Sequence, residues 1–165
     1  MTIEIRYAKD SDVSDINDLY NYYIKETVFT FDIQEKNILE KESWFKRFNN
    51  NDSHLCLVGL VNKNLVGFVS SDVFREKEAY KNSIESSVYI NPDHFGKGYG
   101  KQLMISLINK LKDRKIKRIY ALITSPNNPS VNMHKALGFV KKGVLDSAGF
   151  KFEKYWDVDI YELKL

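Results

Sequence analysis

Three glycines fall within five residues of this chain, Gly96, Gly98 and Gly100, although only 8 occur among its 165 residues. They follow a strand-like segment at residues 83–90 and precede apolar residues at helical spacing from Lys101 onward. Glycine frees the backbone, and the first N–H groups of a helix have no partner inside it. The cluster therefore predicts a strand-to-helix turn that binds an anion, most naturally a pyrophosphate.

Two other phosphate-binding turns fit these residues poorly. A P-loop requires Gly-Lys-Ser/Thr, and here Gln102 follows Gly100 and Lys101. A Rossmann turn lies in the first β-α unit with an acidic residue about 20 positions later, whereas this cluster is mid-chain and residues 117–120 contain no acid. A tight turn without any ligand is the remaining alternative.

Charge and composition indicate an ordinary soluble protein. The chain has 25 Lys and Arg against 22 Asp and Glu, a net charge of +3, and is 43% hydrophobic, which argues against disorder. Its length predicts a single domain over residues 1–165. Acids and bases are mixed, as in Glu40-Lys41-Glu42, which predicts solvated surface. The densest basic stretch, residues 110–118, is typical of an exposed helix end, so no nucleic-acid partner is expected.

The single cysteine and the apolar runs bear on the compartment. Cys56 lies inside an apolar segment at residues 55–58, which predicts a core residue and fits a reducing compartment. No apolar run approaches the roughly 18 residues of a membrane span, and the first residues lack a signal-peptide core. We expect a cytoplasmic protein without a membrane partner.

The periodicity of apolar residues predicts alternating runs of strands and helices. Strands are expected at residues 3–7, 55–61, 65–73, 83–90, 118–124 and 155–163, with a hairpin turn at residues 62–64. Helices are expected after Asp10 or Ser11, over about 39–49, from Lys101 and over 131–137. A three-strand antiparallel run followed by a β-α-β crossover defines an α+β (mixed α/β) fold with a mixed sheet.

The chain resembles the GNAT superfamily of acyl-CoA-dependent N-acyltransferases over nearly its whole length. The family signature Gln/Arg-x-x-Gly-x-Gly/Ala is matched at residues 95–100, with Phe95 in place of the Gln or Arg. Residues 85–90, 127–139 and 149–158 resemble the phosphinothricin and methionine-sulfone acetyltransferase branch. Glu153 and Tyr155 stand where that branch usually has glycine and tryptophan. The resemblance implies a central, mostly antiparallel sheet with a splayed parallel pair flanked by helices.

The same resemblance implies acetyl-CoA as the cofactor. Backbone N–H groups of Gly96, Lys97, Gly98, Tyr99, Gly100 and Lys101 would hold its pyrophosphate, and the lysine side chains would reach CoA phosphates. The strand residues Val88, Tyr89 and Ile90 would pair with the pantetheine amides. Asn127 would bind the pantetheine arm, although its place near two prolines equally favours an Asx turn.

Two residues are candidates for proton transfer. Glu85 would act as the general base that takes a proton from the acceptor ammonium; without the resemblance, a surface or paired strand glutamate is the simpler interpretation. His134 would protonate the departing thiolate, relay protons or orient the acceptor. A lone histidine beside Met133 and Leu137 is otherwise a packing residue.

The acceptor pocket is expected to involve aromatic and basic side chains. Phe29 and Phe31 follow a helix and would wall the pocket, whereas Tyr20 and Tyr23 are interpreted as core. Arg75 and Lys77 precede Tyr80 where the branch carries Arg-x-Arg before its tyrosine, and would clamp an acceptor carboxylate. Interleaved glutamates make a solvated loop the competing interpretation.

Together these features predict an N-acetyltransferase acting on the α-amine of a small amino acid or analogue, with no metal site. The expected acceptors are phosphinothricin, methionine sulfone and methionine sulfoximine, and the resemblance suggests a homodimer. The alternatives are an acetyltransferase for protein N-termini and a non-catalytic CoA-binding regulatory module.

Overall fold

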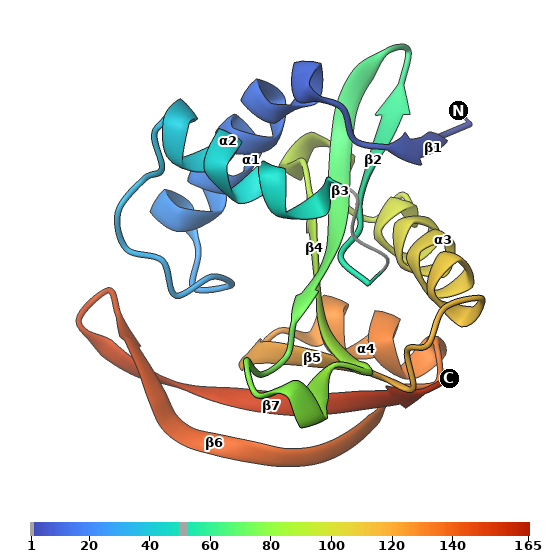
Figure 1. The fold of residues 1–165 in the computed structure, drawn as a ribbon. Helices are drawn as coiled ribbons and strands as arrows, with labels where there is room; N and C mark the ends of the chain where they lie inside the picture. Colours follow the sequence, from blue (N-terminus) through green and yellow to red (C-terminus); the bar gives the residue numbers. More distant parts are fainter. Residues whose placement is uncertain (1, 50–52) are drawn as a thin grey trace.

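One mixed sheet organises the computed structural model, which describes residues 2–49 and 53–165 (Figure 1). Over these residues the strand order is β1-β2-β3-β4-β5-β7-β6. The strands are β1 (Glu4–Tyr7), β2 (Cys56–Val61), β3 (Asn64–Val73), β4 (Ser83–Ile90), β5 (Arg118–Ser125), β6 (Val140–Lys151) and β7 (Lys154–Lys164). Only β4 and β5 pair in parallel among them. The predicted α+β fold with a mixed, mostly antiparallel sheet is confirmed.

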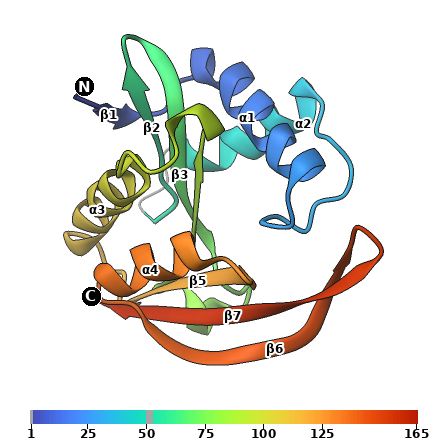
Figure 2. The same cartoon turned by 180° about the vertical axis from the view of Figure 1, so that it is seen from behind.

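Four α-helices in the same described residues cover the two faces of this sheet. They are α1 (Val13–Glu26), α2 (Ile38–Phe45), α3 (Tyr99–Lys112) and α4 (Asn128–Ala136). The helices α1 and α2 pack on Cys56, Val58 and Phe68, whereas α3 packs on Leu57 and Val69. Because alternate strand residues point to opposite faces, α1 and α2 lie on one face and α3 lies on the other (Figures 1 and 2).

Most predicted elements appear close to their expected bounds. The turn between β2 and β3 places Asn62 and Lys63 at φ 51° and 68°, the left-handed conformation that a tight hairpin turn requires. The expected helix over residues 39–49 is shorter: α2 ends at Phe45, and a 3-10 turn follows at Lys46–Phe48. None of the helices in residues 2–49 and 53–165 is long and apolar enough to cross a membrane.

The strand β6 is the element that the sequence interpretation missed. Its pairing with β7 shifts register twice, between Lys141 and Gly143 and again between Leu145 and Gly149. These irregularities interrupt the two-residue alternation that identifies a strand. Lysines in this strand also make its sequence resemble an exposed loop. In the structure, Lys141 forms an ion pair with Asp159 on β7 at 2.7 Å.

The β6–β7 hairpin reaches across to the loop that follows α1 (Figure 2). The Lys151 ammonium donates a hydrogen bond to the Thr30 carbonyl oxygen at 2.8 Å. The ring of Phe31 lies so close to Gly149 that an added Cβ would come within 2.1 Å of it. The hairpin therefore fixes the loop over residues 27–37, which borders the site described next.

Candidate functional site

Strands β4 and β5 pair over only three residues and then separate. Residues 83–85 lie opposite residues 118–120, and the Ser86 hydroxyl donates to the Tyr120 carbonyl oxygen at 3.3 Å. Beyond this point β4 stays paired with β3 as far as Ile90, and β5 stays paired with β7 as far as Ser125. A gap therefore opens in the middle of the sheet, with the backbone of β4 along one side, as expected for a splayed pair.

The backbone polar groups of β4 alternate between β3 and this gap. The Asn91 N–H donates to the Val66 carbonyl oxygen of β3 at 2.9 Å. Because the backbone groups of successive residues in a strand point to opposite sides, the N–H and carbonyl groups of Ile90 and Val88 point away from β3. The Tyr23 hydroxyl engages both groups of Ile90: it donates to the carbonyl oxygen at 2.8 Å and accepts from the N–H at 3.2 Å. Val88 thus offers an N–H and a carbonyl oxygen to an extended ligand.

The glycine cluster forms the turn into α3. Gly96 and Gly98 have φ values of 74° and 76°, and a Cβ added at either would meet nothing within 4 Å. Gly98 is the N-cap of α3, so the first N–H groups of the helix head into open space without intrahelical partners. Gly100 serves packing instead, because its added Cβ would lie 3.3 Å from Met133 Sδ. The turn has the geometry of an anion site.

A cavity of about 570 Å³ extends from this turn along the gap. Nearly all residues predicted for the cofactor line it: Val88, Tyr89, Ile90, Gly96, Gly98, Tyr99, Gly100, Lys101 and Asn127. The side chain of Lys97 is held in the turn, where its ammonium donates to the Asp93 carbonyl oxygen at 2.8 Å. The Asn127 carboxamide oxygen caps α4 by accepting from the Ser130 N–H at 3.3 Å, which leaves the amide donors for a ligand.

His134 lines the same cavity and is 3% exposed. Its Nδ1 lies 2.8 Å from the Ser130 carbonyl oxygen. Because a carbonyl oxygen can only accept, Nδ1 carries the proton, and Nε2 of the neutral ring is an acceptor. Burial lowers the pKa of His134, against a smaller opposing effect of the Ser130 hydrogen bond. The neutral ring packs edge-on against Phe139 with centroids 4.9 Å apart, so the geometry suits packing and proton acceptance better than proton donation.

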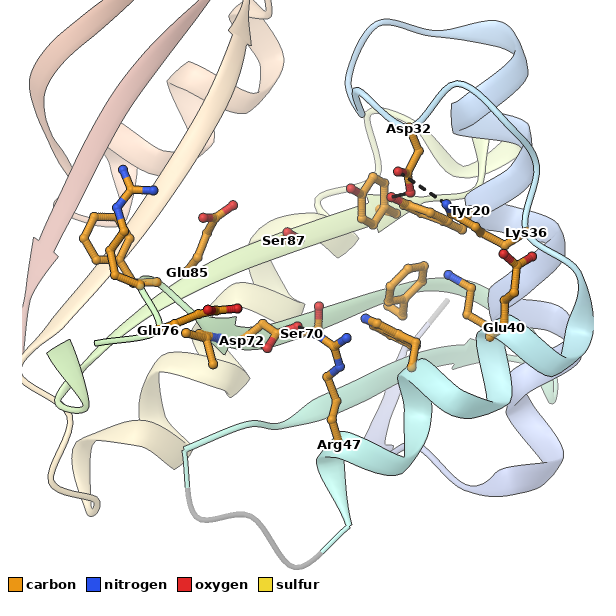
Figure 3. A pocket seen from close by; sticks show the side chains of 17 residues that line it. Tyr20, Asp32, Lys36, Glu40, Arg47, Ser70, Asp72, Glu76, Glu85 and Ser87 are labelled. Atoms are coloured by element: carbon orange, nitrogen blue, oxygen red, sulfur yellow. Dashed lines mark hydrogen bonds and ion pairs between the residues drawn. The ribbon is translucent and has the colours of Figure 1, made fainter. Parts of the chain in front are cut away.

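A second cavity, of about 730 Å³, lies between β3, β4 and the helices α1 and α2 (Figure 3). Its lining includes Ser87 and Tyr89, which also line the first cavity. The two cavities therefore share part of their wall at the stretch of β4 where the sheet opens. Two molecules, one in each cavity, would both lie against this strand.

Glu85 stands on β4 at one end of the second cavity (Figure 3). It lies opposite Asp72 of β3, whose carboxylate forms an ion pair with Arg47. Burial raises the pKa of Glu85, the charge of Asp72 raises it further, and Arg75 opposes both. A half-buried carboxylate with a raised pKa beside a cavity is a stronger base than an exposed one and is suited to accept a proton from a substrate.

The second cavity, called the acceptor cavity below, is lined by only part of the set predicted for the acceptor pocket. Phe29 lines the cavity along the gap, and Phe31 packs against Gly149 of the β6–β7 hairpin. Arg75 lines the acceptor cavity, with its guanidinium 5.1 Å from the Phe74 ring. Lys77 and Tyr80 lie outside the lining found among the described residues. Tyr80 packs edge-on against Phe74, with centroids 5.9 Å apart.

The other end of the acceptor cavity was missed from the sequence. Tyr20, interpreted as core, lines the cavity, and its hydroxyl donates to Asp32 at 2.8 Å; Tyr23 is buried as expected. Lys41, assigned to solvated surface, is 4% exposed and lines the same cavity beside Trp44. The sequence could have indicated this burial, because Lys41 and Phe45 are four residues apart and therefore lie on the same face of the helix.

The fold and the two cavities that share β4 suit an enzyme that brings two substrates together, and known proteins identify which kind. Residues 16–139 match the model of the Acetyltransferase (GNAT) family. The chain therefore belongs to this family and is an N-acetyltransferase.

Its relatives include enzymes that act on amino acid analogues. A phosphinothricin N-acetyltransferase of Streptomyces coelicolor is 33% identical over 99% of this chain and 96% of that protein. An L-methionine sulfoximine/L-methionine sulfone acetyltransferase of Pseudomonas aeruginosa is 27% identical over 100% of this chain and 96% of that protein. The solved structure of a GNAT phosphinothricin acetyltransferase from Sinorhizobium meliloti, in complex with AcCoA, superposes with a TM-score of 0.95. It is 26% identical and covers 100% of this chain and 89% of that chain.

Proposed function

We propose that the protein transfers an acetyl group from acetyl-CoA to the α-amine of a small amino acid or analogue. The observation that carries this proposal is that Ser87 and Tyr89 line both cavities. It allows direct transfer with both substrates bound, which is favoured because holding two reactants in line lowers the barrier by roughly 7–11 kcal/mol. Relatives named for phosphinothricin and for methionine sulfoximine and sulfone support this acceptor class.

The cavity along the gap fits acetyl-CoA, which supplies the acetyl group as an activated thioester. The turn at Gly96 and Gly98 has open space at both Cβ positions and would hold the pyrophosphate with backbone N–H groups. Val88 would bind the pantetheine amides through its backbone, and Lys101 and Asn127 line the same path. Lys97 contributes its backbone, because its side chain is held by Asp93.

Glu85 acts as the general base in this proposal. It takes a proton from the acceptor ammonium, directly or through a water, so that the nitrogen lone pair becomes available for attack. No acyl-enzyme is required. Cys56 is 3% exposed, and burial raises the pKa of its thiol to about 12, so it is unsuited to act as a nucleophile.

His134 forms part of the wall of the cavity along the gap. Its protonated Nδ1 holds the Ser130 carbonyl oxygen, and its Nε2 can accept a hydrogen bond from a ligand or a water. Arg75 is the residue we assign to an acceptor carboxylate, since it lines the acceptor cavity near Glu85.

We further propose a single cytoplasmic domain that forms a homodimer. Apolar side chains are exposed on the β6–β7 hairpin: Val140, Val144, Leu145, Phe150, Phe152 and Tyr155 are all at least 41% exposed. Exposed apolar groups gathered on one element favour an interface. Light scattering at low micromolar concentration should give twice the mass of the chain, and a monomer at all concentrations would exclude the dimer.

An acceptor screen with detection of released thiol tests the function. Phosphinothricin, methionine sulfone, methionine sulfoximine, the common L-amino acids and short peptides would be compared at saturating acetyl-CoA. We expect release with one or more free amino acids or analogues and none with peptides. Release only with peptides would establish the N-terminal alternative. Thermal stabilisation by acetyl-CoA without release from any acceptor would establish the non-catalytic one.

A further inference from the structure

Lys41 is a buried ammonium group without an ion-pair partner among residues 2–49 and 53–165. Its side chain extends from α2 into the lining of the acceptor cavity and is 4% exposed. Its Nζ lies 3.8 Å from the centroid of the Tyr20 ring and 4.6 Å from that of Trp44. Across the described residues it forms neither an ion pair nor a hydrogen bond. Burying an ammonium without a partner is unfavourable, so the site is suited to an anion from outside.

The acidic side chains near Lys41 are committed to other partners. Asp32 accepts a hydrogen bond from the Tyr20 hydroxyl at 2.8 Å and forms an ion pair with Lys36 at 3.5 Å. The Glu40 carboxylate accepts from the Asn37 N–H at 2.8 Å in the cap of α2. Lys41 is therefore left as the unpaired buried cation in the described lining of this cavity.

Charged side chains of both signs line the cavity. In Figure 3, Glu85 lies at one end of the cavity, whereas Tyr20, Lys36 and Glu40 lie at the other. Lys41 contacts the Tyr20 ring and is also close enough to Cys56 for an electrostatic interaction. Cys56 is paired with Ser70, which is paired with Ser87, so the backbone positions of Cys56 and Glu85 are about 10 Å apart across two strand spacings and about 7 Å apart along the strands. The side chains of Lys41 and Glu85 both extend from their backbones into the cavity between these positions.

We propose that Lys41 binds an anionic group on the side chain of the acceptor, so that the preferred acceptor is an amino acid with a carboxylate or phosphinate in its side chain. This assignment rests on the proposed acetyl transfer to amino acids. The acceptor amine would lie toward Glu85, its α-carboxylate toward Arg75 and its side-chain anion toward Lys41. The rings of Tyr20 and Trp44 hold the Lys41 side chain in place for this contact.

Titration of Lys41 gives the assignment a pH signature. Burial lowers the pKa of Lys41 to about 8; Asp32 and Cys56 oppose this, and Lys36 and Arg47 add to it. The other titratable groups lining the cavity are Tyr20, Glu40, Asp72, Arg75, Glu76, Glu85 and Tyr89. The cation is present below about pH 8 and is lost as pH rises through that value. Because kcat/KM reports the free enzyme, preference for an anionic acceptor should fall over the same range.

Two acceptors of nearly equal shape but different charge allow the effect of side-chain charge to be measured apart from that of side-chain size. Phosphinothricin ends in a methylphosphinate anion, and methionine sulfone ends in a neutral methylsulfone. We expect Lys41→Met to lower kcat/KM for phosphinothricin by roughly 10–100-fold, as for loss of a hydrogen bond between charged groups, and to change that for methionine sulfone by less than about threefold. The ratio of the two values should fall between pH 7 and 9 in the unaltered enzyme and stay level in the variant.

Lys46→Met serves as the matched control, since it removes the same charge from an exposed residue five positions away. Its ratio should follow that of the unaltered enzyme. Equal losses for both acceptors in Lys41→Met, or an unchanged ratio, would overturn the role of Lys41 and leave the proposed function intact. Lys41→Gln, measured alongside, decides the matter if the methionine variant does not fold. Failure of the unaltered enzyme to acetylate either acceptor or any other free amino acid would overturn both proposals.

Discussion

Replacing Gly98 tests whether the turn before α3 holds an anion. Gly98 has φ 76°, and a Cβ there would meet no atom within 4 Å, so a substitution strains the backbone without a clash. Asn and Asp tolerate this conformation better than other residues with a side chain. The variants Gly98→Asn and Gly98→Asp therefore add nearly the same bulk and differ by one negative charge.

The added negative charge should affect the unfolding temperature and the binding of acetyl-CoA in opposite directions. A carboxylate at a helix start is favourable by about 0.3–1 kcal/mol, so the aspartate variant should unfold at the same temperature as the asparagine variant or higher. A charge about 4 Å from a bound pyrophosphate costs roughly 1–4 kcal/mol, depending on the effective dielectric constant. The KM for acetyl-CoA should thus be at least about fivefold higher for Gly98→Asp than for Gly98→Asn, and the difference should shrink with added salt.

Initial rates of thiol release at varied acetyl-CoA measure this difference, and melting curves measure stability. Gly143→Asp provides the control, because an added Cβ at Gly143 on β6 also meets nothing within 4 Å. That variant should keep the KM of the unaltered enzyme. The same KM for both Gly98 variants at low salt would refute the anion site at this turn.

Three further predictions follow from the acceptor cavity and the β6–β7 hairpin. Glu85→Gln should lower kcat by about 10²–10⁴-fold with little change in KM for acetyl-CoA, and an unchanged kcat would exclude Glu85 as the base. The same variant should raise Tm at pH 8, because burial disfavours the charged carboxylate that the substitution removes. Asp72→Asn removes a charge that raises the pKa of Glu85, so the acid limb of the kcat/KM profile should move to lower pH, and a shift to higher pH would contradict the assignment. Gly149→Ala should lower Tm, because the added Cβ would lie 2.1 Å from the Phe31 ring. Adding Phe31→Ala should restore much of the lost Tm in the double variant, and additive losses of the two substitutions would disprove the contact.

The turn before α3 could be predicted from the sequence because it depends on local backbone geometry. Gly96 and Gly98 are needed at positive φ within one short turn, and the strand and helix on either side have clear periods. Val88, Tyr89 and Ile90 were singled out by the family resemblance instead, and they line the cavity along the gap.

The acceptor site could be predicted only in part because it is assembled from distant segments. Glu85 lies on a strand that was recognised, whereas Lys41 lies on a helix whose charged sequence resembles a solvated face. Its burial depends on Tyr20 and Trp44 closing around it, which no local pattern encodes. The contact of Phe31 with Gly149 could not be predicted, because β6 lacks a regular alternation.

The gap between β4 and β5 also bears on how the molecule holds together. Among the described residues, the two halves of the sheet, β1–β4 and β5–β7, share only a short stretch of backbone pairing: residues 83–85 lie opposite residues 118–120, and the N–H groups of Lys117 and Arg118 donate to the Asn82 carbonyl oxygen at 2.8 and 3.4 Å. A ligand that pairs with Val88 and contacts α4 lies across both halves, in the manner of an added strand. Acetyl-CoA would therefore couple the two halves as a single cooperative unit and slow exchange of amide hydrogens on both sides of the gap. Substrate binding and mechanical integrity are, in this enzyme, properties of the same interruption in the sheet.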